Sequence, residues 1–173
     1  MQLGSRGIVL LAFVVCAAGA SAAHAQDSSW RLGASLTRLD YDLSGTGHAP
    51  ALAVRAERDL WSNVSLEVGG TYAKPSQQFG GSTLFMPEVQ VHYNWNAGRV
   101  SPYAGGGIGT ALRIAPFFSD WDPTLSVAGG AAVRLTDRLS LTGELRVRNH
   151  EWQFAGTTTE LGAGLAWRLP STF

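Results

Sequence analysis

Residues 125–148 read LSVAGGAAVRLTDRLSLTGELRVR, and apolar and polar side chains alternate along almost all of this stretch. Side chains of a β-strand point to opposite faces in turn, so each half of the stretch predicts a strand with one apolar face. The halves meet at residues 135–138, LTDR, which predict a short turn and hence a hairpin. The polar face carries Glu144, Arg146 and Arg148 at successive positions.

Such a charged face has two structural interpretations. In a soluble sheet the charges face water and the apolar face covers a core. In a closed barrel that crosses a membrane, the apolar face contacts lipid and the charged face points inward. The remainder of the chain distinguishes between these two arrangements.

Length and composition narrow the class of protein. The chain has 173 residues, which suits one domain, and its formal net charge is zero, which gives no support for nucleic-acid binding. The 21 glycines within strand-patterned sequence argue against a helical bundle. Six tryptophans argue against a disordered chain.

The N-terminus has the pattern of a secretory signal peptide. Arg6 supplies the positive charge, residues 8–20 form an apolar run, and residues 23–25, AHA, match a small-x-small cleavage site. We therefore expect a signal peptide at residues 1–25 and a mature domain at residues 26–173. The apolar run is shorter than the ~20 residues of a transmembrane helix. The single cysteine, Cys16, lies within the signal, so we expect a mature chain without thiols, as suits an oxidising periplasm.

The alternation recurs in eight segments that we expect to be strands. They are residues 30–43, 51–60, 64–72, 85–95, 99–114, 125–135, 139–148 and 158–169. The apolar parity shifts near Thr37 and Arg38, which predicts a β-bulge there. The connections alternate between short turns and longer loops, the longer ones at residues 44–50, 74–82, 115–123 and 149–156.

Three features favour the membrane barrel over a soluble barrel of the lipocalin type. They are the export signal, the aromatic residues near the strand ends, and the asymmetry of the connections. The predicted fold class is therefore all-β: an eight-stranded antiparallel up-and-down transmembrane β-barrel preceded by a signal peptide. An even number of strands would place both termini in the periplasm.

Charged residues on the polar face are then expected inside the barrel. They are Arg55, Glu57, Glu67, Glu88, Arg113, Arg134, Glu144, Arg146, Arg148 and Arg168. A charge buried there has to be paired, because an unpaired one costs several kcal/mol. Two interpretations stay open: a salt-bridged plug, and a gated narrow channel whose ion pairs exchange partners.

The pattern resembles the OmpA-like family of small outer-membrane β-barrels. Residues 100–109, VSPYAGGGIG, residues 132–145, AVRLTDRLSLTGEL, and the terminal Phe173 carry the resemblance. It implies a location in the outer membrane of a Gram-negative-type envelope, among outer-membrane lipids and lipopolysaccharide. It also implies that the barrel-assembly machinery reads the last strand, which ends at Phe173. We expect a monomer.

Some barrels of this size act on lipid A, and the sequence gives little support for such an enzyme. The deacylase kind carries a His-x-Ser motif with a later Glu, but Glu151 and Trp152 follow His150, although Glu160 is present. The palmitoyltransferase kind needs an apolar interior, which the expected charges exclude. His48 and His150 are predicted in loops and His92 in the interior. The sequence therefore indicates no catalytic, cofactor-binding or metal-binding residues.

Two groups in the predicted loops have a functional alternative. Asp120 and Asp122 flank Trp121 and belong either to a solvated loop or to a site for calcium or for cation-bridged lipopolysaccharide phosphates. Aromatic residues of the third and fourth loops are interfacial anchors or a contact surface; they are Phe117, Phe118, Trp121, Trp152 and Phe154. The predicted function is a structural or surface-interaction role in the envelope. The alternatives are a narrow pore for small solutes and a lipid A-modifying enzyme.

Overall fold

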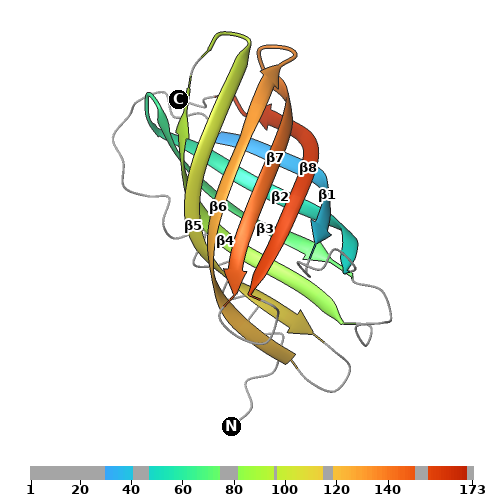
Figure 1. The fold of residues 1–173 in the computed structure, drawn as a ribbon. Helices are drawn as coiled ribbons and strands as arrows, with labels where there is room; N and C mark the ends of the chain where they lie inside the picture. The colour runs from blue at the N-terminus through green and yellow to red at the C-terminus, as the bar shows by residue number, and fades with distance from the viewer. Residues whose placement is uncertain are drawn as a thin grey trace.

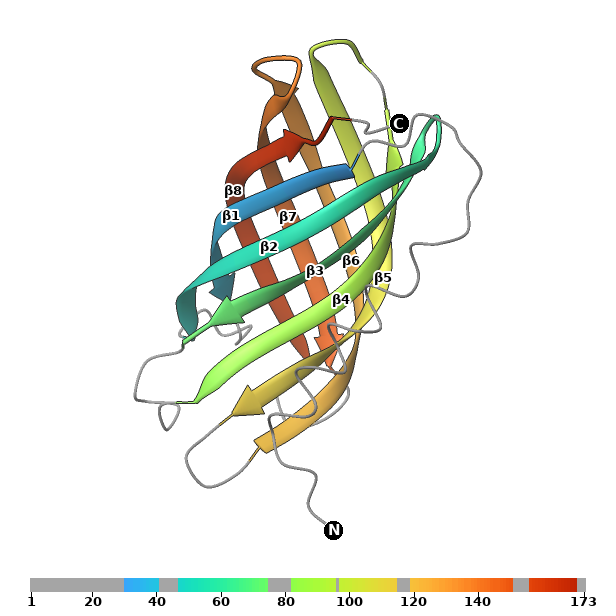
Figure 2. The same cartoon turned by 180° about the vertical axis from the view of Figure 1, so that it is seen from behind.

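The structure, a computed structural model, is a closed barrel of eight antiparallel strands (Figures 1 and 2). It describes residues 30–40, 47–74, 82–95, 97–114, 119–150 and 156–170. The predicted signal peptide at residues 1–25 and the terminal Phe173 lie outside the described residues, as do Phe117, Phe118, Trp152 and Phe154. Among the described residues, no helix is long and apolar enough to cross a membrane.

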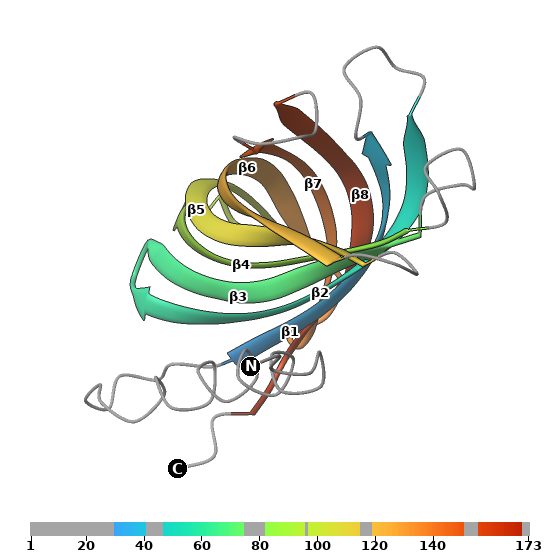
Figure 3. The ribbon, with the colours of Figure 1, turned by 90° about the horizontal axis from the view of Figure 1, so that it is seen from below.

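Each strand pairs with the next along the chain, and the first pairs with the last. The strands are β1 (Trp30–Asp40), β2 (His48–Trp61), β3 (Val64–Ala73), β4 (Thr83–Asn94), β5 (Val100–Ile114), β6 (Ser119–Arg134), β7 (Leu139–His150) and β8 (Thr157–Arg168). The ladder between β1 and β8, which closes the barrel, extends from the Arg31–Arg168 pair to the Asp40–Thr159 pair. The closed ring of strands leaves no free sheet edge (Figure 3).

The two ends of the barrel differ. The end at which β1 begins and β8 ends, at the top of Figure 1, carries the connections from β2 to β3, from β4 to β5 and from β6 to β7; we call it the turn end. The opposite end, the loop end, carries the other four connections. The third of these has only residues 115–118, because β5 and β6 are the longest strands, at 15 and 16 residues.

Apolar side chains face outward and polar side chains face inward, as the alternation predicts. Leu125 and Val127 of β6 are 66% and 62% exposed, whereas Ser126 between them is 5% exposed. Arg146 and Arg148 of β7 are fully buried in the barrel interior. This is the reverse of a soluble barrel and the arrangement that lipid requires.

The predicted bulge at Thr37 and Arg38 is wrong. β1 pairs residue by residue with both neighbours, so Leu39 points into the barrel and Arg38 points outward. Leu39 belongs to an apolar cluster inside the loop end, whose members are Leu39, Ala51, Ala73, Leu84, Met86 and Ala111. The interior therefore has an apolar part at this end, and Leu39 faces it, so the parity shift needs no extra residue. A register shift occurs instead between β2 and β3, at Asp59 and Trp61.

Three predicted loops are shorter than expected, because polar residues continue the strands. Residues 48–50 belong to β2, residues 119–123 to β6, and residues 149–150 to β7. Asp122 and His150 consequently point into the barrel and are 7% and 2% exposed. Their polarity suits the inward face, so it did not mark the end of a strand.

Aromatic residues gather near both ends of the outer face. Trp61, Tyr93, Trp95 and Trp167 lie at the turn end, and Tyr72 and Trp121 lie towards the loop end; all are at least 45% exposed. Tyr93 and Trp95 meet edge to face, with ring centroids 5.0 Å apart. Such rings suit the two interfaces of a membrane, where one side of the ring contacts headgroups.

Candidate functional site

A group of charged side chains crosses the middle of the barrel interior, and we call it the central charge cluster. Its members are Arg55, Glu67, Glu88, Glu144, Arg146, Arg148 and Glu160. They come from β2, β3, β4, β7 and β8, so the cluster ties together strands on opposite sides of the barrel. Alternation along each strand points all of them inward.

Arg146 lies at the centre of the cluster. Its Nε donates a hydrogen bond to Glu144 at 2.9 Å, and its Nη2 donates one to Glu67 at 2.7 Å. Its Nη1 is hydrogen-bonded to Glu88. The planar guanidinium can donate in several directions at once, which suits arginine to this position better than lysine.

Arg148 continues the cluster towards the loop end. Its Nη2 donates to Glu88 at 2.6 Å and its Nη1 donates to Glu160 at 2.7 Å. Arg55, from the other side of the barrel, bridges Glu144 at 3.0 Å and Glu160 at 3.2 Å. Three arginines therefore share four glutamates in a continuous network.

Neutral side chains complete the hydrogen bonding of the glutamates. The Tyr103 hydroxyl donates to Glu144 at 2.7 Å, and Thr71 donates to Glu160 at 3.0 Å. Tyr103 reaches Glu144 across Gly130, where an added Cβ would lie 2.7 Å from the tyrosine oxygen. The interior of an eight-stranded barrel is just wide enough for side chains to fill, and here this network fills its middle.

Glycines of β5 make room for the polar side chains of β4. A Cβ on Gly109 would lie 2.7 Å from the Cβ of Glu88, and Gly105 and Gly107 face His92 and Gln90 in the same way. The glycine run therefore lies within β5 and provides space for the side chains of the neighbouring strand. The next element that the structure describes after this strand is β6, so the glycine run does not open a helix as a phosphate-binding loop does.

Two of the remaining predicted interior charges, Glu57 and Arg113, pair elsewhere. Glu57 accepts a hydrogen bond from Arg31 at 2.9 Å, and Arg113 binds Asp120 at 2.6 Å near the loop end. Arg31 and Glu160 take part in ion pairs but are absent from the predicted set. Glu160 could have been found, because it shares its parity with the inward-facing Gly162 and Gly164.

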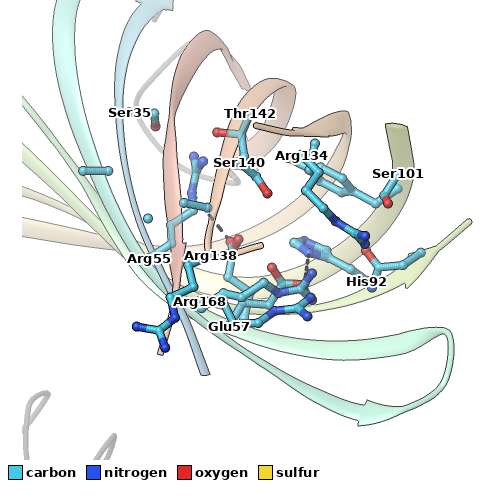
Figure 4. A pocket seen from close by; sticks show the side chains of 18 of the residues that line it. Ser35, Arg55, Glu57, His92, Ser101, Arg134, Arg138, Ser140, Thr142 and Arg168 are labelled. Atoms are coloured by element: carbon cyan, nitrogen blue, oxygen red, sulfur yellow. Dashed lines mark hydrogen bonds and ion pairs between the residues drawn. The ribbon is translucent and has the colours of Figure 1, made fainter. Parts of the chain in front are cut away.

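A cavity of about 100 Å³ lies between the central charge cluster and the turn end (Figure 4). Five arginines and three acids line it, together with the hydroxyl groups of Ser101, Ser140 and Thr142. Arg134 and Arg168, predicted as interior charges, are in this lining rather than in the cluster.

The three histidines that the structure describes all lie on strands. His92 is inside the barrel, as predicted, and its Nε2 lies 2.8 Å from the amide oxygen of Gln90. His150 is not in a loop: it is buried, with Nε2 2.9 Å from the Thr158 hydroxyl on the paired strand. His48 is the first residue of β2. Within the described ranges, no group of three or more His, Cys, Asp or Glu side chains is placed to hold a metal ion.

The sequence pattern of the family "Outer membrane protein beta-barrel domain" matches residues 8–168. The chain belongs to this family. Its place is therefore the outer membrane, which agrees with the apolar outer face and the aromatic residues at both ends of the barrel. No curated protein matches the sequence.

Solved structures show the same fold. Neisserial surface protein A is 15% identical, with a TM-score of 0.67 over 85% of this chain and 100% of that chain. The N-terminal β-barrel domain of OprF from Pseudomonas aeruginosa is 12% identical, with a TM-score of 0.63 over 82% and 97%. The outer membrane enzyme PagL is 12% identical, with a TM-score of 0.53 over 80% and 99%. At these identities the likeness shows the fold alone.

Proposed function

We propose that this protein is a closed outer-membrane barrel with a structural or surface-interaction role. Its interior conducts no solute and carries no catalysis, and its loop end presents the connections between strands to the exterior. The observation that carries this proposal is the central charge cluster, whose arginines Arg146 and Arg148 are fully buried and bound on several sides.

The energetics of the cluster support a permanently closed interior. Removing one partner from a buried ion pair costs about 3–5 kcal/mol, because a charge is left without compensation. Opening a path past Arg146 would break its bonds to three glutamates at once. On the loop side, the apolar cluster around Leu39 and Met86 adds a second obstacle to ions.

The same contacts argue against catalysis by these residues. Glu160 is the later glutamate that a deacylase-type site would need, and it is bound by Arg148 and Arg55. Its carboxylate is occupied by these two guanidinium groups and is therefore not free to orient a histidine. The charged interior also offers no apolar channel for an acyl chain.

The same proposal includes the export of the chain, its insertion into the membrane and the molecules that surround it. The chain is exported with a signal peptide at residues 1–25, which is removed, and residues 26–173 insert as a monomer. The barrel-assembly machinery reads the last strand, ending at Phe173. The outer face contacts outer-membrane lipids and lipopolysaccharide, and no nucleic acid is involved. Loops on a rigid scaffold commonly carry binding functions, so a surface partner would contact the loop end.

Single-channel recording in a planar bilayer tests the closed interior. The protein is purified from outer membranes, and slower migration after heating than before heating confirms that the barrel was folded. We expect no discrete conductance steps under conditions in which a large porin, added as a control, gives them. Steps in the wild type that change in size in Glu144→Ala would contradict the proposal and support the narrow pore.

A further inference from the structure

The cavity at the turn end is unlike the rest of the interior because its positive charges are not balanced. Five arginines and three acids line it. Two of those acids are already bound, Glu57 by Arg31 and Glu67 by Arg146. Three arginines of the wall, Arg134, Arg138 and Arg168, make no ion pair within the part of the chain that the structure describes.

The backbone brings these arginines to one place. Arg168 and Arg138 are joined by a main-chain hydrogen bond of 2.7 Å, from the amide of Arg168 to the carbonyl of Arg138. Arg134, at the end of β6, pairs with Ser140 of β7. In the view of Figure 4, Arg134 lies to one side of the cavity and Arg138 and Arg168 lie to the other.

One of these arginines lies directly opposite another positive charge. Arg168 of β8 and Arg31 of β1 are paired residues of the closing ladder. Like charges at directly opposed positions destabilise a sheet. Asp59 attracts Arg168, but its carboxylate is held by Arg31 at 2.5 Å. Because Glu57 and Asp59 both bind Arg31, their charges offset that arginine, and Arg168 is left without an ion pair of its own among the described residues.

The size and polarity of the cavity limit what it can hold. Its volume of about 100 Å³ has room for several waters or for one small anion, but not for an acyl chain. Hydroxyl groups of Ser101, Ser140 and Thr142 add donors to those of the arginines. Arginine forks match the oxygens of phosphate, which they bind by paired, charge-assisted hydrogen bonds.

We propose that the turn-end cavity, with Arg134, Arg138 and Arg168, is a binding site for a phosphate group. The group could be free inorganic phosphate or the headgroup of a membrane phospholipid. Arg134, Arg138 and Arg168 are all exposed, and Trp167 beside Arg168 is one of the aromatic residues at the turn end of the outer face, so lipid headgroups lie within reach of the opening. The site lies on the turn side of the central charge cluster and does not depend on whether the interior conducts.

Titration with inorganic phosphate tests the site directly. The protein is purified from outer membranes in a phosphate-free maltoside detergent at low ionic strength, and binding is followed by calorimetry and by ³¹P NMR. We expect the triple variant R134Q/R138Q/R168Q to bind at least about tenfold more weakly than the wild type, because each substitution removes charge-assisted hydrogen bonds.

The matched control is Arg58→Gln, which removes one positive charge at the same end but on the outer face, where Arg58 lies 5.7 Å from the Trp30 ring centroid. Its phosphate affinity should stay within about twofold of the wild type. Heat-dependent gel migration shows that each variant is folded. If the triple variant does not fold, R138Q/R168Q at the exposed rim replaces it.

Native mass spectrometry distinguishes the two sources of phosphate. A phospholipid that co-purifies with the wild type and with Arg58→Gln, but not with the triple variant, identifies a lipid headgroup as the occupant. Phosphate binding without retained lipid identifies the free ion. Equal phosphate affinity of the wild type and the triple variant, or the absence of both phosphate binding and retained lipid, would overturn the proposal.

Discussion

Glu88 is the glutamate that both central arginines share, and this makes it the most informative residue to change. We expect Glu88→Gln to lower the free energy of unfolding by about 3 kcal/mol, because Arg146 and Arg148 each lose a charged partner. Urea unfolding in lipid vesicles, followed by tryptophan fluorescence, measures the loss.

The control for this prediction is Asp40→Asn, the same change of carboxylate to amide at an exposed ion pair with Arg38. Its cost should be below about 1 kcal/mol, since water screens that pair. Equal costs for the two variants would mean that the buried cluster contributes no more than a surface contact.

Gly130 provides the space through which Tyr103 reaches Glu144. We expect Gly130→Ala to destabilise the barrel by about 1–3 kcal/mol, because the added methyl group would meet the main-chain carbonyl oxygen of Gly143 and would lie 2.7 Å from the tyrosine oxygen. Gly143→Ala is the matched control, since a Cβ there meets nothing within 4 Å, and its effect should stay within about 0.5 kcal/mol. The same unfolding experiment compares the two, and a neutral Gly130→Ala would contradict the close packing of Tyr103.

At the scale of the strand, the outer face of β4 shows where the membrane lies. Val89 is midway between Phe85 and Tyr93, which lie towards opposite ends of the barrel. We expect Val89→Arg to cost about 2–4 kcal/mol in lipid vesicles, as for a charge at the bilayer midplane. Val100→Arg, at the first residue of β5 and at the turn end, should cost only about 0–1 kcal/mol. Similar costs at both positions would argue against this placement of the bilayer.

The strands also show what sequence periodicity can and cannot predict. Which face of a strand is apolar depends only on the alternation within that strand, so the two faces were predictable. Where a strand ends was less so, because Asp122 and His150 are polar and yet continue β6 and β7 on the inward face. Leu39 led to a different error: because it is apolar it was expected on the outer face after a bulge, but it faces an apolar part of the interior.

At the scale of the whole molecule, the partners of the ion pairs could not be predicted before the closed barrel was known. Partners such as Arg146 and Glu67 are 79 residues apart in the sequence, and they meet only because the barrel closes. Alternation placed both inside but could not choose between the available carboxylates without the register of the strands. For the same reason Arg134 and Arg168 were expected inside the barrel but not as the wall of a cavity, and Arg138 was expected only in a turn.

The central claim about the whole molecule is that lipid surrounds the apolar face and the polar face is enclosed. Single cysteines at positions 125, 126, 127 and 128, made in a Cys16→Ser chain and labelled with a nitroxide, test this claim. The measured quantity is the accessibility of each nitroxide to molecular oxygen, obtained from electron paramagnetic resonance. Oxygen concentrates in the bilayer, so a label that faces lipid has high accessibility. Leu125 and Val127 are exposed, while Ser126 and Ala128 are 5% and 7% exposed. We therefore predict high accessibility to oxygen at 125 and 127 and low accessibility at 126 and 128. The reverse alternation, or none, would contradict the fold and its orientation in the membrane.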